Sequence, residues 1–216
     1  MATLVFDYDG TLHDSIKIYA PAFRLAYNHL VSHGLMPDRI WSDQEISIWL
    51  GYTSKDMWNS FPNTISQETK DLCSQMIGEE MLHLINSGKA QLYPETLDML
   101  KRLKADGHTL IFLSNCKHNY MIASCKYFGL ERYFSAFYCS EDCDWIPKYK
   151  IFNQIKKDYS GEFIIIGDRF QDMEIAQKHG LKFIGCAYGY GQPGELSRAQ
   201  YIVHNPLEIC KVYMIL

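Results

Sequence analysis

The chain has 216 residues, of which 47% are hydrophobic, 14% aromatic and 21% charged, and it carries a formal net charge of −4 at pH 7. This composition is typical of a folded globular protein rather than a disordered or fibrous one. The length suits one core with an inserted second unit. Without a basic block, nucleic acid and anionic membrane surfaces are poor partners. No stretch reaches the roughly 20 apolar residues of a membrane span.

The amino-terminal stretch ATLVFDYDG and the cysteines indicate the compartment. The stretch lacks the basic region and small-residue cleavage site of a secretory signal. Seven cysteines, an odd number at scattered positions, suit a reducing compartment better than a disulfide framework. Cys139 and Cys143 are four residues apart with no second Cys or His pair beside them, so the zinc signal is weak. We expect a cytoplasmic protein with free, structural thiols.

Short apolar runs recur along the chain, beginning with TLVFD at residues 3–7 and continuing with HTLIFLSN, FSAFYCS, EFIIIGD, KFIGCAY and QYIVH. Helical patterns alternate with them, such as YPETLDMLKRLKADG, which starts near Pro94 and stops at Gly107. Runs that are apolar on both faces and alternate with helices predict a parallel sheet covered on both sides. We therefore predict the α/β class, with a doubly wound Rossmann-like core formed by residues 1–14 and 90–216.

Residues 15–89 interrupt this alternation, because they hold helical patterns and no convincing strand. Either Asp14 or Ser15 would cap the first of these helices, and Ser42 and Glu45 have the spacing of a capping box. The segment leaves the core just after the first strand, so it would lie over that strand's carboxyl end. Open α/β sheets bind their ligands at this edge. We predict an inserted all-helical cap domain that acts as a lid.

Two aspartates, Asp7 and Asp9, stand at the end of the first predicted strand and are followed by Gly10. An Asp-Gly pair between apolar residues also suits a two-residue hairpin turn, and these residues alone leave that alternative open. A calcium-binding loop is excluded, because its Gly and Glu positions hold Leu12 and Ile18.

Polar residues also follow the other predicted strands. Ser114 and Asn115 come after LIFL, and Asp168 and Asp172 come after EFIIIG. Taken singly, each has an ordinary structural explanation, such as a turn or a carboxylate in the first turn of a helix. Core packing gives no reason to gather four carboxylates at one edge of a sheet. Their joint placement therefore indicates a functional site.

Neighbouring carboxylates raise one another's pKa or require a cation. Hard oxygen ligands favour Mg2+, which is commonly held by one or two carboxylates together with phosphate oxygens. We therefore expect Asp7 and Asp168 to bind Mg2+. A lysine with short hydroxyl or amide donors would complete a phosphate-binding site, and backbone N–H groups near Gly10, Thr11 and Asn115 would extend it.

The order DxDGT, an apolar run ending in Ser-Asn, a Lys and GDxxxD resembles the four motifs of the haloacid dehalogenase superfamily of hydrolases. DYDGTLHDS, LIFLSN and GDRFQDMEIAQKHGLKFIGCAYGYG are most similar to its phosphoglycolate phosphatase-like branch, which also carries a helical cap after the first motif. The resemblance covers essentially the whole chain. The lysine is the loosest match, because Pro147 precedes Lys148 whereas the branch often has Lys followed by Pro. The spacing to Ile-Phe favours Lys148 over Lys150.

The resemblance implies a magnesium-dependent phosphatase that hydrolyses a small phosphomonoester through an aspartyl-phosphate intermediate. Asp7 would be the nucleophile, and Asp9 would protonate the leaving oxygen and then activate water. Mg2+ would be held by Asp7, the carbonyl of Asp9 and Asp168. Lys148 and Ser114 would orient the phosphoryl group.

Two further roles and several alternative functions belong to the same interpretation. Asp172 would position Lys148 or a metal-bound water. Lys55 lies in LGYTSKDMW, where cap residues of this branch face the site, so it would meet a substrate carboxylate or second phosphate unless it is a solvated helix charge. A β-phosphoglucomutase-like phosphomutase, a pyrophosphatase and a non-catalytic metabolite-binding regulator are the alternatives. We expect a small phosphorylated metabolite as partner and a monomer or small homo-oligomer.

Overall fold

The computed structural model describes residues 1–213 and contains one parallel sheet of six strands in the order β3-β2-β1-β4-β5-β6. This is the strand order of doubly wound dinucleotide-binding folds. The strands are β1 (Thr3–Phe6), β2 (Thr109–Ser114), β3 (Ala136–Cys139), β4 (Phe163–Gly167), β5 (Lys182–Cys186) and β6 (Tyr201–Val203). Each strand coincides with one of the predicted apolar runs. The predicted doubly wound α/β fold is therefore confirmed.

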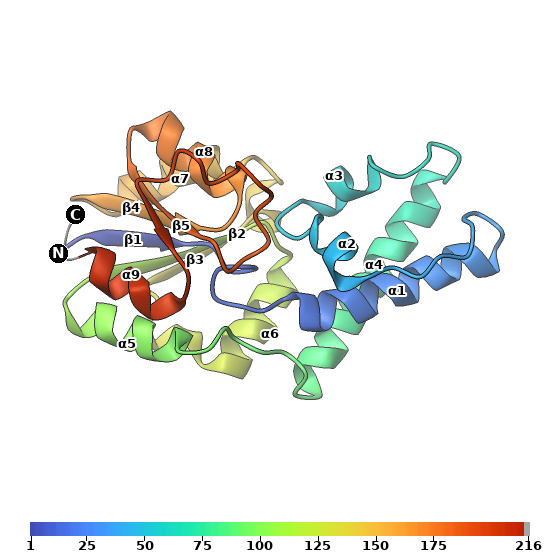
Figure 1. Ribbon diagram of the computed structural model, residues 1–216, viewed down its shortest axis with the longest axis horizontal. Coiled ribbons are helices and arrows are strands. Elements are labelled where there is room, and N and C mark those ends of the chain that lie inside the picture. The colour runs from blue at the N-terminus through green and yellow to red at the C-terminus, as the bar shows by residue number, and fades with distance from the viewer. Residues whose placement is uncertain (214–216) are drawn as a thin grey trace.

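Helices cover both faces of the sheet (Figure 1). They are α5 (Thr96–Ala105), α6 (His118–Phe128), α7 (Lys148–Asp158), α8 (Phe170–His179) and α9 (Pro206–Tyr213), with 3-10 turns η1 (Leu130–Arg132) and η2 (Glu141–Cys143). Successive side chains of a strand point to opposite faces. In β1, Leu4 and Phe6 therefore join the core under α5, α6 and α9, whereas Val5 joins the core under α7 and α8. Burial on both faces explains why the strands are apolar throughout.

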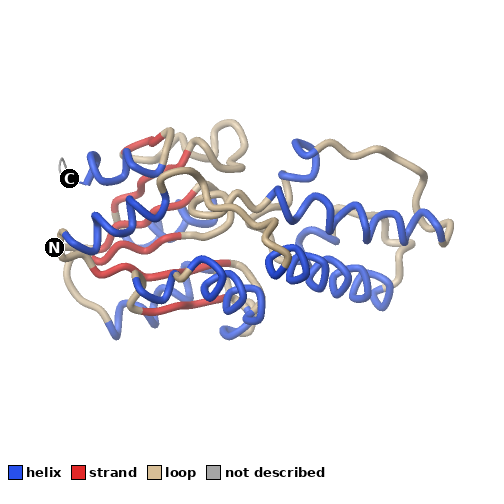
Figure 2. The backbone as a smooth tube through the Cα atoms, turned by 90° about the horizontal axis from the view of Figure 1, so that it is seen from below, coloured by secondary structure: helices blue, strands red, loops and turns tan. Residues whose placement is uncertain are grey.

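Four helices lie together beyond the carboxyl ends of the strands, at the end of the molecule opposite the amino terminus and α9 (Figures 1 and 2). They are α1 (Ile16–Ser32), α2 (Asp43–Ser47), α3 (Ser54–Trp58) and α4 (Gln67–Asn86). We call them the cap. The cap has a hydrophobic core of its own, in which the rings of Phe23 and Trp49 stack 5.0 Å apart. The insert after the first strand is thus a packed unit, which the chain joins to the sheet by loops.

Two predicted helix starts are wrong. Helix α5 begins at Thr96, two residues after Pro94, and follows a left-handed Glu95 with φ +66°. Ser15 occupies the N-cap position of α1 but does not cap it, because its hydroxyl donates a 2.5 Å hydrogen bond to Asp9 instead. The carboxylate therefore competes successfully for the side chain that would cap the helix.

Other local predictions hold. The capping box of Ser42 and Glu45 is present at the start of α2. All seven cysteines are free, and most of them are buried. Within residues 1–213, no helix is both long enough and apolar enough to cross a membrane.

We predict that Ile164→Ala lowers the free energy of unfolding by about 2–5 kcal/mol, because its fully buried side chain on β4 would leave a cavity in the core. Ile202→Ala is the matched control, since it removes the same β-branched side chain from a strand position that is 48% exposed. The control should lower the free energy of unfolding by about 0.5 kcal/mol or less. Urea denaturation measures both values, and equal costs would contradict the placement of β4 at the centre of the sheet.

Candidate active site

The chain turns tightly at the carboxyl end of β1. The N–H groups of Thr11, Leu12 and His13 all donate to the carbonyl of Tyr8, at 3.2, 2.9 and 3.0 Å. Because β1 pairs in parallel with β2 on one side and β4 on the other, this turn does not join two antiparallel strands. The hairpin alternative is therefore excluded. The turn instead leads the chain from the centre of the sheet into the cap.

Only glycine fits at position 10 of this turn. Gly10 has φ +85°, a conformation that residues with a Cβ rarely adopt. A Cβ there would lie 2.1 Å from Oδ2 of Asp168. The close approach lets the loop after β1 lie directly against the carboxylate that follows β4.

Three buried carboxylates and one buried lysine meet at this edge of the sheet. Nζ of Lys148 lies 2.6 Å from Oδ1 of Asp7 and 2.7 Å from Oδ1 of Asp172. One carboxylate oxygen from each of Asp7, Asp168 and Asp172 lies within 4.8 Å of the other two. Lys148 comes from the first turn of α7 and Asp172 from the first turn of α8. Four separate elements of the core thus converge on Asp7.

The cluster carries more negative charge than its single lysine neutralises. Burial raises the pKa of Asp7 to about 7, and the Asp172 carboxylate adds to the rise while Lys148 opposes it. Burial and the neighbouring carboxylates of Asp7 and Asp172 also raise the pKa of Asp168. Burial alone would lower the pKa of Lys148, but the two carboxylates in contact with it outweigh that effect and raise its pKa. The ammonium group therefore stays charged.

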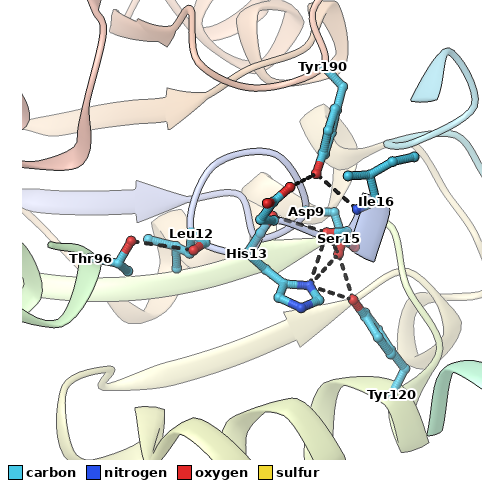
Figure 3. A network of polar contacts seen from close by, with 9 residues as sticks. Asp9, Leu12, His13, Ser15, Ile16, Thr96, Tyr120 and Tyr190 are labelled. Carbon is cyan, nitrogen blue, oxygen red and sulfur yellow. Dashed lines mark hydrogen bonds and ion pairs between the residues drawn. The ribbon is translucent and has the colours of Figure 1, made fainter. Parts of the chain in front are cut away.

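Asp9 lies in a separate network of hydroxyl and imidazole groups (Figure 3). Its Oδ1 accepts hydrogen bonds from the hydroxyls of Tyr120 at 2.7 Å and Ser15 at 2.5 Å, and it lies 3.4 Å from Nδ1 of His13. Burial raises the pKa of Asp9, but the contacts with His13, Ser15 and Tyr120 outweigh burial and lower it below its usual value. Tyr190 follows β5, and its hydroxyl donates a hydrogen bond to Asp14 and accepts one from the N–H of Ile16. It therefore connects the segment after β5 to the start of α1. The two motif aspartates thus lie in opposite electrostatic environments.

Several predicted site residues have other partners in this structure. The N–H of Gly10 donates to the carbonyl of His13, and that of Thr11 donates to Tyr8, so neither of these donors is free for phosphate. The Thr11 hydroxyl instead donates to Asp168, at 3.4 Å. Both N–H groups thus have partners within the turn in this structure, and their predicted role in binding phosphate stays a prediction.

The remaining predicted residues divide by location. Ser114 is buried at the end of β2, beside the end of β1. The Asn115 side chain accepts a hydrogen bond from the Ser140 hydroxyl at 2.6 Å and donates one to the cap carbonyl of Gly51 at 3.1 Å. Lys150 is exposed on α7, whereas Lys148 is buried against Asp7.

Comparison with known proteins assigns the family. The haloacid dehalogenase-like hydrolase family matches residues 4–186. The chain belongs to this family. A phosphoglycolate phosphatase of Psychrobacter arcticus is 25% identical over 87% of this chain and 84% of its own length. A 5'-nucleotidase of Pseudomonas aeruginosa is 28% identical, but the match spans only about half of each chain (52% and 51%). A crystal structure described as a predicted phosphatase from Clostridium acetobutylicum superposes with a TM-score of 0.83 at 22% identity, covering 100% and 99% of the two chains.

In this member of the hydrolase family, a buried arginine joins the core to the cap. Arg169 follows Asp168, and its guanidinium donates to the carbonyls of Ile48, at 3.3 Å, and Leu50. Its Nε also donates to Oε2 of Glu195 at 2.8 Å. The side chain thus links the loop after β4, the segment after β5 and the cap segment after α2. With Asn115, it holds that cap segment against the sheet edge.

Sequence reasoning missed the residues that support the site. Tyr120 and His13 surround Asp9, while Arg169 and Tyr190 join the site to the cap. His13 and Arg169 lie inside the two most specific motifs, and this position was the one sequence signal that could have identified them as site residues. Tyr120 lies in α6, and its sequence pattern showed nothing beyond an amphipathic helix.

Arg169→Met should increase amide hydrogen exchange in cap residues 49–53 by about 10- to 100-fold, because hydrogen bonds from a charged group contribute about 1.5–3 kcal/mol. Arg198→Met removes an exposed arginine from the segment between β5 and β6 and serves as the control. Hydrogen exchange followed by mass spectrometry reports the local opening. Unchanged protection of this segment in Arg169→Met would show that Arg169 does not hold the cap.

Proposed function

We propose that the protein hydrolyses a small phosphomonoester through an aspartyl phosphate on Asp7, with Mg2+ as its cofactor. The observation that carries this proposal is the position of the Asp7 carboxylate. It lies at the carboxyl end of the central strand, 2.6 Å from the Lys148 ammonium group and beside the carboxylates of Asp168 and Asp172. The phosphatase names of similar proteins agree with this chemistry.

The carboxylate cluster fits a magnesium ion. Its donors are hard oxygens, the ligand type that Mg2+ prefers. Burial and mutual repulsion raise the pKa values of Asp7 and Asp168 despite the nearby charges of Lys148 and Arg169, so a further cation would favour their ionised forms. We assign Asp7, Asp168 and the backbone carbonyl of Asp9 as the residues that would hold the ion. When bound, it would supply positive charge that lets an anionic carboxylate and an anionic ester approach each other.

The first chemical step uses Asp7 and Lys148. A carboxylate oxygen of Asp7 would form a bond to phosphorus while the bond from phosphorus to the ester oxygen breaks. Lys148 would shift its contact from Asp7 toward the phosphoryl oxygens, and Ser114 would add a hydroxyl donor. Asp172 would keep the ammonium group in place, since it contacts Lys148 at 2.7 Å. Asp172 is therefore a positioning residue in this proposal.

Asp9 would move the protons of both steps. The anionic phosphate of a substrate would raise the pKa of this carboxyl group, so that Asp9 binds a proton and then donates it to the leaving oxygen. The Asp9 carboxylate would next remove a proton from water, which attacks the phosphorus of the intermediate and releases inorganic phosphate from Asp7. Ser15 and Tyr120 stabilise the ionised form and orient it. The cap would exclude water during phosphoryl transfer and readmit it for hydrolysis of the intermediate.

Compartment and assembly are part of the same proposal. We place the enzyme in the cytoplasm, and the free state of all seven cysteines supports a reducing compartment. We propose a monomer or a small homo-oligomer that acts on phosphorylated metabolites. Lys55 is exposed on α3. Its role as a substrate selector stays a prediction.

Metal binding should appear in thermal stability as well as in activity. At a Mg2+ concentration about 100-fold above Kd, we expect the Tm to rise by roughly 5–10 °C. Asp168→Asn should remove this rise and abolish turnover, yet it should unfold at a higher temperature than the wild type in EDTA, because it removes one of three repelling buried carboxylates. Asp38→Asn, at an exposed loop position, is the control and should keep the wild-type response. Full activity in excess EDTA would refute the metal assignment.

The two motif aspartates should fail in different ways. Asp7→Asn should give neither turnover nor a phosphoenzyme with any substrate. Asp9→Asn should slow turnover by about 10²–10⁴-fold. With an aryl phosphate, whose leaving group needs little protonation, this variant should accumulate labelled phosphate on Asp7, because hydrolysis still requires the base. Peptide mapping of the label and its release by hydroxylamine check the assignment, and acid-stable label on another residue would overturn it.

A further inference from the structure

A cavity of about 130 Å³ lies between the cap and the core, and Asp9 forms part of its wall. The cap contributes residues of α1, α4 and the segment 49–57, while the core contributes residues 115–120 and Trp145. Asp9 is the residue proposed above to protonate the leaving oxygen. The alcohol portion of the ester must therefore extend from Asp9 into this cavity. The lining should show which alcohols the enzyme accepts.

Aromatic side chains line the cavity from both the cap and the core. Tyr19, Trp49 and Tyr52 come from the cap, and Tyr120 and Trp145 come from the core. They therefore face the cavity from both sides of the interface. Leu50, Met57, Ile77 and Met81 add apolar surface, and small or polar residues form the rest of the wall. Such a surface binds flat apolar groups by burial and by ring stacking, which contributes beyond the buried area.

The lining offers little to a second anionic group. Asp9 and Lys117 are its two charged side chains among the residues that the structure describes. Lys117 is half-buried, and a Cβ on Gly78 of α4 would lie 3.8 Å from its Nζ. Lys55, the predicted anion partner, is exposed and does not form part of this wall. A short carboxylate-bearing alcohol would thus meet one cation and leave the aromatic wall without contact.

The size of the cavity limits the ligand further. A cavity of about 150 Å³ lined by apolar side chains holds one benzene ring. The present cavity is of that order but opens to solvent, so one six-membered ring fits within it. Asn119 and Thr53 add polar groups to its lining, which suits a ring that carries heteroatoms or small polar substituents.

We propose, building on the function proposed above, that the substrate is a phosphomonoester whose alcohol carries one planar six-membered ring. Pyrimidine nucleoside monophosphates and phosphorylated pyridine alcohols share this chemistry. The ring would stack among the aromatic residues of the cap and the core while its phosphate reaches Asp7. Closure of the cap would then depend on the ring, because both sides of the interface contact it.

The test compares kcat/KM values for substrates with similar leaving groups and Mg2+ present. Benzyl phosphate and cyclohexylmethyl phosphate release alcohols of similar basicity but differ in the planarity of the ring. We expect benzyl phosphate to be preferred by about 10-fold or more, and to be preferred over phosphoglycolate by a larger factor. Uridine 5'-monophosphate and pyridoxal 5'-phosphate then distinguish a pyrimidine nucleotide from a phosphorylated pyridine alcohol. Adenosine 5'-monophosphate tests whether a larger, two-ring base is accepted.

Variants of the aromatic wall connect this preference to the cavity. Trp145 is 40% exposed, so Trp145→Leu should leave the fold intact while reducing the ratio of benzyl to cyclohexylmethyl phosphate kcat/KM by about 5-fold or more. Tyr127→Leu removes an aromatic residue of similar exposure (45%) on α6, outside the lining, and should leave the ratio unchanged. Circular dichroism confirms that both variants are folded.

The outcomes separate the two proposals. Failure to hydrolyse any ester, with acetyl phosphate also inert, would refute the proposed function itself. If acetyl phosphate is hydrolysed, and benzyl and cyclohexylmethyl phosphate have equal kcat/KM values, the ring proposal alone would be overturned. A preference for phosphoglycolate that Lys117→Met abolishes would also overturn it, because the cavity would then select a carboxylate through its single lysine.

Discussion

The mutual repulsion of buried carboxylates around Asp7 is the constraint on which the rest of the structure depends. Asp7, Asp168 and Asp172 come from three different elements, yet their oxygens lie within 4.8 Å of one another. One lysine bridges two of them. Such a cluster costs folding free energy unless cations neutralise it. The core of this hydrolase therefore stabilises a site that is unfavourable by itself and that would gain stability from the cation proposed to bind there.

The apolar core of the sheet, which lies away from the charged cluster, supplies the folding free energy that offsets the repulsion. Apolar residues fill both faces of β1, β2 and β4, so the strand ends are held in a fixed register. The polar residues begin only where the strands end. Rigid strands thus place the carboxylates, and the loops after them carry the chemistry. Gly10 belongs to this arrangement, because only a residue without a Cβ lets the loop after β1 approach Asp168.

The cap and the chemistry are connected through the same loops. The turn that presents Asp9 continues directly into α1, and Ser15 uses its hydroxyl on Asp9 rather than on the helix. Arg169 stands next to Asp168 in the chain and contacts the cap carbonyls of Ile48 and Leu50. Movement of the cap would therefore change the surroundings of both Asp9 and the carboxylate cluster. This coupling gives the aromatic cavity a route to influence catalysis, because whatever fills it also holds the cap.

The sequence by itself determined the family, because its motifs lie in a characteristic order along the chain. It also determined the six strands and the α/β fold, because apolar runs of the length typical of buried strands are a local signal. It also pointed to Asp7 and Asp172 through specific motifs and to Lys148 through a looser one, and the structure brings the three together. Only the tertiary structure decided which N–H groups form hydrogen bonds within the turn at Gly10 and Thr11. It also placed Tyr120 and Arg169 beside the site and brought aromatic rings of the cap and the core to one cavity. These contacts join residues far apart in the chain, and packing rather than local pattern selects such partners.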